Sequence, residues 1–156
     1  MKHHPAPWDT ASEKEYHQRF SSQINDWLDQ GFGSCLLQEP RLANIIANAF
    51  HYFDQQRYKL SSFVIMPNHI HVLFQPLQKH RLPQIIKSWK GFTANHITRL
   101  TGSKGSLWQE DYWDRLIRNS RHFAKCLEYI RNNSGKAHLH KSQYLLYENI
   151  NNSHGF

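Results

Sequence analysis

The spacing of apolar residues divides the chain into helical and extended segments. Apolar residues recur every three or four positions in four segments, a period typical of amphipathic helices. The expected helices cover residues 12–30, 40–53, 82–100 and 121–133. Gly31 and Gly33 are expected to end the first helix, and Pro40 suits the first turn of the second. Ser120 is expected to cap the last helix and Gly135 to end it.

Extended segments lie between the second, third and fourth of these helices. Residues 57–66 and 69–75 are rich in aromatic and β-branched side chains, and Pro67 and Asn68 between them favour a tight turn. The two segments should therefore pair as an antiparallel hairpin. A further strand is expected within residues 107–117. The order helix, helix, strand, strand, helix, strand, helix predicts an α+β fold, with helices packed on a mainly antiparallel sheet.

Length and composition favour a single domain over residues 1–156. Of the 156 residues, 39% are apolar and 13% aromatic, which is enough to bury a core. Residues 1–11 lack periodicity and are expected to form a loose tail. Residues 138–156 form a mostly polar C-terminal extension that could fold over the core.

Charge favours a polyanionic partner such as nucleic acid. The 19 Lys and Arg residues exceed the 12 Asp and Glu residues and give a net charge of +7. A basic protein without such a partner is the alternative. Cys35 and Cys126 make no disulfide framework, and no apolar run approaches the roughly 20 residues of a membrane span. We expect a cytoplasmic protein with reduced thiols and no membrane contact.

Two histidines one residue apart are the first candidates for chemistry. Successive strand side chains point to opposite faces, so His69 and His71 share one face while Ile70 and Val72 share the other. Neutral imidazole is a common metal ligand, and two imidazoles in this arrangement can bind one ion. The alternative is a pair of ordinary polar residues on the solvent side of a half-buried strand. A metal site would need a further donor from elsewhere in the chain or from a substrate.

The last expected helix carries a second candidate. Phe123, Leu127 and Ile130 form its apolar stripe. Tyr129 lies beside that stripe, with Asn133 one turn later. Tyr129 could be a packing residue with a satisfied hydroxyl. If this helix faces the histidines, however, its phenol could attack a phosphodiester that a divalent cation polarises.

Four segments, taken together and in order, resemble one known family. They are "MPNHIHVLF", "SWKGFTANHITRL", "LWQEDYWDRLIRN" and "HFAKCLEYIRNNSGKA". The chain is similar to the single-tyrosine HUH transposases of the insertion sequence 200/605 type. Within these it most resembles the tyrosine transposases associated with repetitive extragenic palindromes (REP). HUH denotes two histidines around a bulky hydrophobic residue, here His69, Ile70 and His71.

The resemblance implies a fold, an activity and roles for several residues. The fold would be a ferredoxin-like, palm-type sandwich with the histidines on a central strand. His69, His71 and the polar Asn133 would bind Mg²⁺ or Mn²⁺. Tyr129 would cut single-stranded DNA near a palindromic hairpin and keep the 5′ phosphate as a phosphotyrosine. Glu128 could replace Asn133, although its helical position points it elsewhere.

The sequence departs from the family pattern at two places. Asn133 is followed by Ser134, where the family usually has proline. Nothing within residues 1–16 shows the alternating strand with which family members normally begin. Either the chain is shortened or another segment supplies that strand, and a missing strand would expose a sheet edge.

Basic residues in two parts of the chain are candidates for phosphate contacts. One group follows the hairpin and the other leads into the tyrosine helix: Lys87, Lys90, Arg99 and Lys104, then Arg115, Arg118, Arg121 and Lys125. They could give salt-sensitive affinity for DNA, or they could form solvated helix faces. Aromatic residues among them could stack on bases or pack in the core: Trp89, Phe92, Trp108, Tyr112 and Trp113. For Trp108 and Trp113, core packing is favoured.

The leading interpretation is a metal-dependent endonuclease and strand transferase that acts on single-stranded or hairpin DNA. It would be cytoplasmic and nucleoid-associated, with a homodimer as one option. The alternative is a non-catalytic relative that only binds hairpin DNA. A histidine-rich zinc protein is disfavoured, because the chain lacks the closed Cys and His ligand set of zinc sites. The target repeat and the oligomeric state do not follow from the sequence.

Overall fold

The structure, a computed structural model, describes residues 22–27, 35–77, 79–109 and 113–152. Its elements in chain order are β1 (Ser22–Trp27), α2 (Pro40–Tyr52), β2 (Tyr58–Ile65), β3 (His69–Pro76), α3 (Leu82–Thr101), β4 (Trp113–Arg115), α4 (Ser120–Lys136) and β5 (Leu145–Glu148). Short 3₁₀ turns are found at Leu36–Gln38, Lys141–Gln143 and Ile150–Asn152.

In the described part of the chain, five strands form one antiparallel sheet with β3 in the middle. The strand order is β4-β1-β3-β2-β5, and every neighbouring pair is antiparallel. β2 and β3 form the expected hairpin, in which Met66 N donates a hydrogen bond of 2.8 Å to His69 O across the turn. Because β3 is hydrogen-bonded to a strand on each side, its register in the sheet is fixed.

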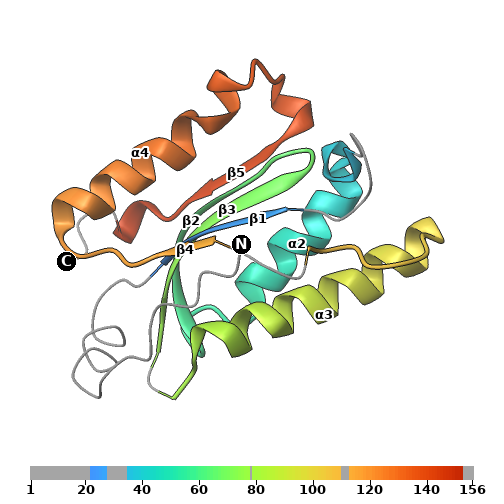
Figure 1. Cartoon of the computed structure of the whole chain (residues 1–156). Coiled ribbons are helices and arrows are strands. Elements are labelled where there is room, and N and C mark those ends of the chain that lie inside the picture. Colours follow the sequence, from blue (N-terminus) through green and yellow to red (C-terminus); the bar gives the residue numbers. More distant parts are fainter. Residues whose placement is uncertain (1–21, 28–34, 78, 110–112, 153–156) are drawn as a thin grey trace.

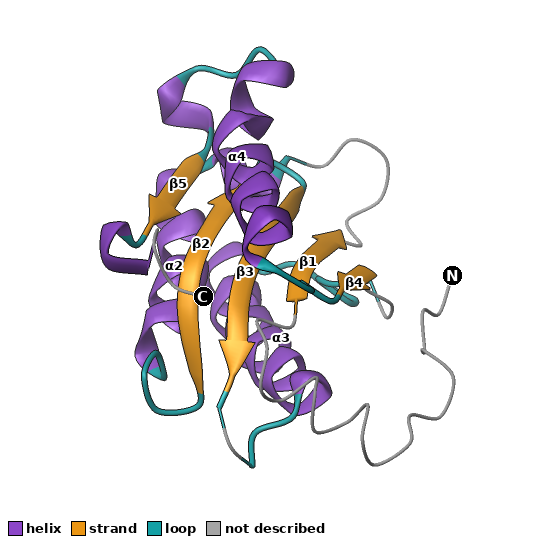
Figure 2. Ribbon diagram, turned by 90° about the vertical axis from the view of Figure 1, so that its left-hand side faces the viewer, coloured by secondary structure: helices purple, strands orange, loops and turns teal. Residues whose placement is uncertain are grey.

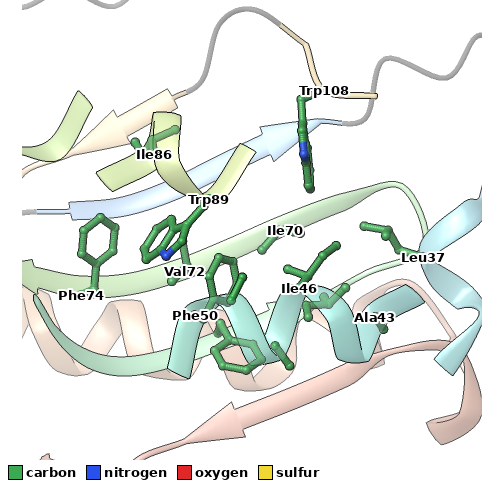
Figure 3. Packing of buried hydrophobic residues seen from close by; sticks show 14 of the residues in the cluster. Leu37, Ala43, Ile46, Phe50, Ile70, Val72, Phe74, Ile86, Trp89 and Trp108 are labelled. Carbon is green, nitrogen blue, oxygen red and sulfur yellow. The ribbon is translucent and has the colours of Figure 1, made fainter. Parts of the chain in front are cut away.

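Helices cover both faces of the sheet, so each face has its own core. Figure 1 shows α2 and α3 on one face and α4 on the other, and Figure 2 shows α4 lying over β3 from a second direction. Alternation along β3 separates the two cores. Ile70, Val72 and Phe74 pack under α2 and α3, whereas Leu73 packs under α4. Figure 3 shows part of the first core, where Trp89 of α3 lies against β3.

The α+β sandwich that the resemblance implied is confirmed. The succession β1, α2, β2, β3, α3, β4 with the strand order β4-β1-β3-β2 is the ferredoxin-like arrangement. The hairpin strands and the helices α2 and α3 lie close to their expected bounds. The sequence also correctly predicted a strand within residues 107–117, which is β4.

The helix expected over residues 12–30 is wrong where the structure describes it. Residues 22–27 form strand β1, which pairs with β3 along its whole length and with β4 on its other side. A recurrence of apolar residues favours a helix only weakly, and backbone pairing with two strands outweighs it. β1 also supplies the strand that the N-terminal sequence lacked. The rest of that expected helix, its glycine stop and the expected tail over 1–11 lie outside the described residues.

The last helix begins and ends differently from the expectation. Ser120 is its first helical residue, and the capping side chain belongs to Asn119, whose Oδ1 accepts a hydrogen bond of 2.8 Å from His122 N. The helix continues past Gly135 to Lys136. Gly135 does not end it, because this glycine does not adopt the left-handed conformation that usually terminates a helix.

The C-terminal extension adds strand β5 at the edge of the sheet. β5 pairs with β2, where Ser62 Oγ donates a hydrogen bond of 2.9 Å to Tyr147 O and Asn149 N donates one of 2.9 Å to Ser61 O. The Tyr147 ring stacks on Phe63 at a centroid distance of 5.1 Å, so the extension covers part of the core. Within the described residues, none of the helices has both the length and the apolar character needed to cross a membrane.

Candidate active site

The central strand carries the histidine pair. His69 and His71 lie on β3 on the face opposite to Ile70 and Val72, with ring centroids 5.0 Å apart. His71 is only 3% exposed, and His69 is partly buried. His71 is therefore no ordinary polar residue on a solvated face.

Both imidazoles favour the neutral form. Burial lowers the pKa of His71 to about 3, with a further contribution from the nearby His69. Burial also lowers the pKa of His69. His69 Nδ1 lies 2.9 Å from Asn68 Oδ1, and a proton on that nitrogen would leave the Nε2 lone pair for a ligand. The Nδ1 atom of His71 is buried without a hydrogen-bond partner.

Helix α4 positions Tyr129 against this pair. Its apolar stripe is buried on the sheet, with Phe123 at 4%, Leu127 at 7% and Ile130 fully enclosed. Tyr129 lies beside the stripe and is 42% exposed. Its ring centroid is 5.2 Å from that of His71, and the ring planes meet at 84°. The structure thus brings together a phenol and an imidazole that are far apart in the sequence.

The side chains at and beyond this contact supply part of what a divalent cation requires. Among the described residues, no three His, Cys, Asp or Glu side chains gather at one point. The two imidazoles supply neutral nitrogen donors, including the unpartnered nitrogen of His71. The amide of Asn133, the third predicted ligand, stays a prediction. Asn133 is partly buried on α4, one turn beyond Tyr129. Such an open set leaves coordination positions for water and for a phosphate oxygen.

The predicted DNA-binding residues lie on two sides of the molecule. Arg118, Arg121 and Lys125 are exposed around the start of α4, the helix that carries Tyr129. The other group lies on or just after α3, on the opposite face of the sheet (Figure 1): Lys87, Lys90, Arg99 and Lys104. The structure therefore does not join the two groups into one track beside Tyr129. Arg115 lies on β4, and its side chain is outside the described residues.

Two of the three aromatic residues whose side chains the structure describes among these basic groups belong to the core. Trp89 is 7% exposed and Trp108 is 8% exposed, and Trp108 Nε1 donates a hydrogen bond of 2.9 Å to Thr93 Oγ1. Core packing, which the sequence favoured for Trp108, is confirmed. Phe92 is 48% exposed, and stacking of this ring on a base stays a prediction. The side chains of two others lie outside the described residues: Tyr112 and Trp113.

Two interactions of α4 were not expected from the sequence. Lys136 Nζ lies over the Tyr129 ring, 5.3 Å from its centroid. Arg131 forms a two-point salt bridge with Glu148 of β5, with Nε–Oε2 and Nη2–Oε1 distances of 3.1 and 2.5 Å. The first could have been found from the sequence, because a spacing of seven residues is about two helical turns and places Lys136 and Tyr129 on one face. The second depends on β5 lying beside β2, which no local pattern indicates.

Comparison with known proteins gives these features a family context. The model of the family described as "Transposase IS200 like" matches residues 37–133, more than half of the chain. An uncharacterised protein of Haemophilus influenzae is 29% identical over 104 residues, with 53% of this chain and 56% of that protein covered. The chain thus spans about half the length of this curated relative.

Two solved structures are similar to this chain. A REP-associated tyrosine transposase bound to a REP hairpin has a TM-score of 0.59 at 21% identity, covering 78% of this chain and 71% of that one. A provisionally named transposase from Deinococcus radiodurans has a TM-score of 0.49 at 21% identity, covering 71% and 88%. The first of these has the same fold as this chain. Since the family model extends from α2 through both histidines to Tyr129 and Asn133, the chain belongs to the IS200-like transposases.

Proposed function

We propose that this protein is a metal-dependent single-stranded DNA endonuclease and strand transferase of the REP-associated branch. Tyr129 would be its nucleophile. The contact of Tyr129 with His71, at a ring distance of 5.2 Å, supports this proposal most directly. Hairpin DNA as the substrate is supported by the similar fold of a transposase bound to a REP hairpin.

The reaction would exchange one phosphorus–oxygen bond for another. Tyr129 Oη attacks the phosphorus, the bond to the 3′ oxygen breaks, and the phenolic proton passes through solvent to the released 3′ oxygen, which becomes a hydroxyl. The 5′ phosphate stays on Tyr129. Because a phenol has a pKa of about 10, the phenolate leaves readily when another 3′ hydroxyl attacks. Strand transfer therefore needs no nucleotide cofactor. Mg²⁺ or Mn²⁺ at His69, His71 and Asn133 would supply Lewis-acid polarisation of the phosphate.

The exposure of the site suits a polymeric substrate. Tyr129 is 42% exposed at its position beside the buried His71, so a DNA strand can reach its hydroxyl without opening the core. Arg118, Arg121 and Lys125 are exposed on and before the preceding turns of α4. DNA that lies along this helix would meet these cations on the way to Tyr129, which favours binding through backbone phosphates.

A covalent-adduct assay tests the proposal. The protein is mixed with a hairpin-bearing oligonucleotide, labelled at its 3′ end, in Mg²⁺ or Mn²⁺, and the products are separated under denaturing conditions. We expect labelled protein for the wild type and none for Tyr129→Phe or in EDTA. Tyr52→Phe is the matched control, because Tyr52 is 72% exposed at the end of α2. An adduct formed by Tyr129→Phe would show that the nucleophile is misassigned.

A hairpin-binding protein without cleavage is the second candidate. It is favoured by the lack of a third His, Cys, Asp or Glu ligand among the described residues. Such a protein would bind hairpin DNA and form no adduct with any divalent metal. For the nuclease, a His69→Ala, His71→Ala double variant should keep its hairpin affinity and lose the adduct, because the histidines act on the reacting phosphate.

A further inference from the structure

The tyrosine ring has a cation over it as well as an imidazole beside it. Lys136 follows Tyr129 by seven residues, which is two helical turns and brings it nearly into line on the same face. Helical side chains lean toward the N-terminus, so Lys136 reaches back over Tyr129. Its Nζ atom lies 5.3 Å from the ring centroid. The same ring meets His71 of β3 edge-on at 84°.

The charge of Lys136 is available to a substrate. Arg131, the other basic residue beyond Tyr129 on α4, is held by both carboxylate oxygens of Glu148. No carboxylate within the described part of the chain forms a salt bridge with Lys136, which is exposed. A cation on the last turn of a helix also interacts favourably with the helix dipole, and this is the purely structural alternative.

We propose that Lys136 is a catalytic residue that binds a non-bridging oxygen of the phosphate attacked by Tyr129. This inference rests on the proposed function. Attack by the phenol concentrates negative charge on those oxygens, and an ammonium held close to the attacking ring stabilises that charge. The bond changes remain those at Tyr129, and Lys136 neither forms a covalent bond nor transfers a proton.

The position of Lys136 separates its role from that of the other cations on this helix. Arg121 and Lys125 precede Tyr129 by two turns and one turn, where they would contact phosphates beside the cut. Removing those contacts should lower the affinity for DNA and make that affinity less sensitive to salt concentration. Lys136 contacts the ring of the nucleophile itself, so its removal should slow the reaction of DNA that is already bound.

The test compares Lys136→Met, Lys136→Arg and Lys141→Met, the last being an exposed lysine just beyond α4. The rate of adduct formation is measured in a single turnover at saturating hairpin oligonucleotide. Hairpin affinity is measured separately in a Tyr129→Phe background. We expect Lys136→Met to lower the saturated rate by about 100-fold while affinity changes by no more than about twofold. Lys136→Arg should retain most of the rate, and Lys141→Met should match the wild type.

Three results would overturn the inference. One is a Lys136→Met protein whose folded fraction reacts at the wild-type rate, since Lys136 then serves only the end of the helix. Another is a loss of affinity with an unchanged saturated rate, which would make Lys136 an ordinary DNA contact. The third is a wild-type protein that forms no adduct, which would refute both the proposed function and this inference. The first two results would refute only the role of Lys136 and not that of Tyr129.

Discussion

Acid should destabilise the metal-free protein through His71. This residue is 3% exposed, its Nδ1 atom has no partner, and burial lowers its pKa to about 3. In the unfolded chain the same imidazole has its ordinary pKa of 6.5. Below that pH the unfolded state takes up a proton that the folded state does not accept. Lowering the pH should therefore shift the equilibrium toward unfolding.

Linkage gives the sign and the size of this effect. The contribution of His71 to the free energy of unfolding is fully present above its unfolded pKa of 6.5 and is lost as the pH falls toward the folded value of about 3. The slope is about 1.4 kcal/mol per pH unit, so the loss at about pH 5 is about 2 kcal/mol. That is a large part of the roughly 5–15 kcal/mol by which domains are stable. Burial of His69 lowers its pKa and acts in the same direction.

Urea denaturation in EDTA at about pH 8 and about pH 5 measures the effect, with tryptophan fluorescence as the signal. His71→Gln removes the titrating ring, so the wild type should lose about 2 kcal/mol more between the two pH values than this variant. His96→Gln, an exposed histidine on α3, should behave like the wild type and serves as the matched control. Equal losses in the wild type and His71→Gln would refute the claim that folding holds His71 neutral.

Two further predictions concern positions away from the site, and urea denaturation checks both. Asn119→Ala should lower the free energy of unfolding by about 1 kcal/mol, because Asn119 Oδ1 caps α4 by accepting from His122 N, whereas Ser120→Ala should cost less than about 0.5 kcal/mol. Similar costs for the two would show that the cap is misassigned. Tyr58→Phe should cost about 2 kcal/mol, because the buried Tyr58 hydroxyl accepts from Trp89 Nε1 at 3.1 Å and donates to a carbonyl of α2. A negligible cost would mean that water replaces the hydroxyl in these bonds.

Local sequence patterns correctly predicted those elements whose apolar spacing is compatible with only one type of secondary structure. α2 and α3 each keep one apolar face over their full length, and the turn at Pro67 and Asn68 leaves only an antiparallel pairing for the strands around it. β1 could not be predicted in this way. Its six residues form a strand through pairing with β3 and β4, while a helical period runs across the same residues by coincidence.

The histidines and the tyrosine of the candidate site could be predicted from residue chemistry. The contact between the strand and the helix that carry them could not. Strand alternation places His69 and His71 on one face, and the helical stripe leaves Tyr129 beside the core. Whether that strand and that helix face each other depends on a core built from distant segments, in which Leu73 and Ile130 take part. Only the family resemblance related them beforehand. Lys136 differs, since its contact with Tyr129 lies within one helix.

The two cores explain how this sheet can hold a polar site at its centre. The core under α2 and α3 contains most of the large buried side chains, and the core under α4 is smaller. A buried ring nitrogen without a hydrogen-bond partner, such as His71 Nδ1, costs stability, and His71 lies on the face where less of the apolar packing is found. α4 still packs firmly enough, through Phe123 and Ile130, to fix Tyr129 against that imidazole. Most of the apolar packing of the described residues thus lies on the α2 and α3 face, which leaves the α4 face able to hold the proposed site.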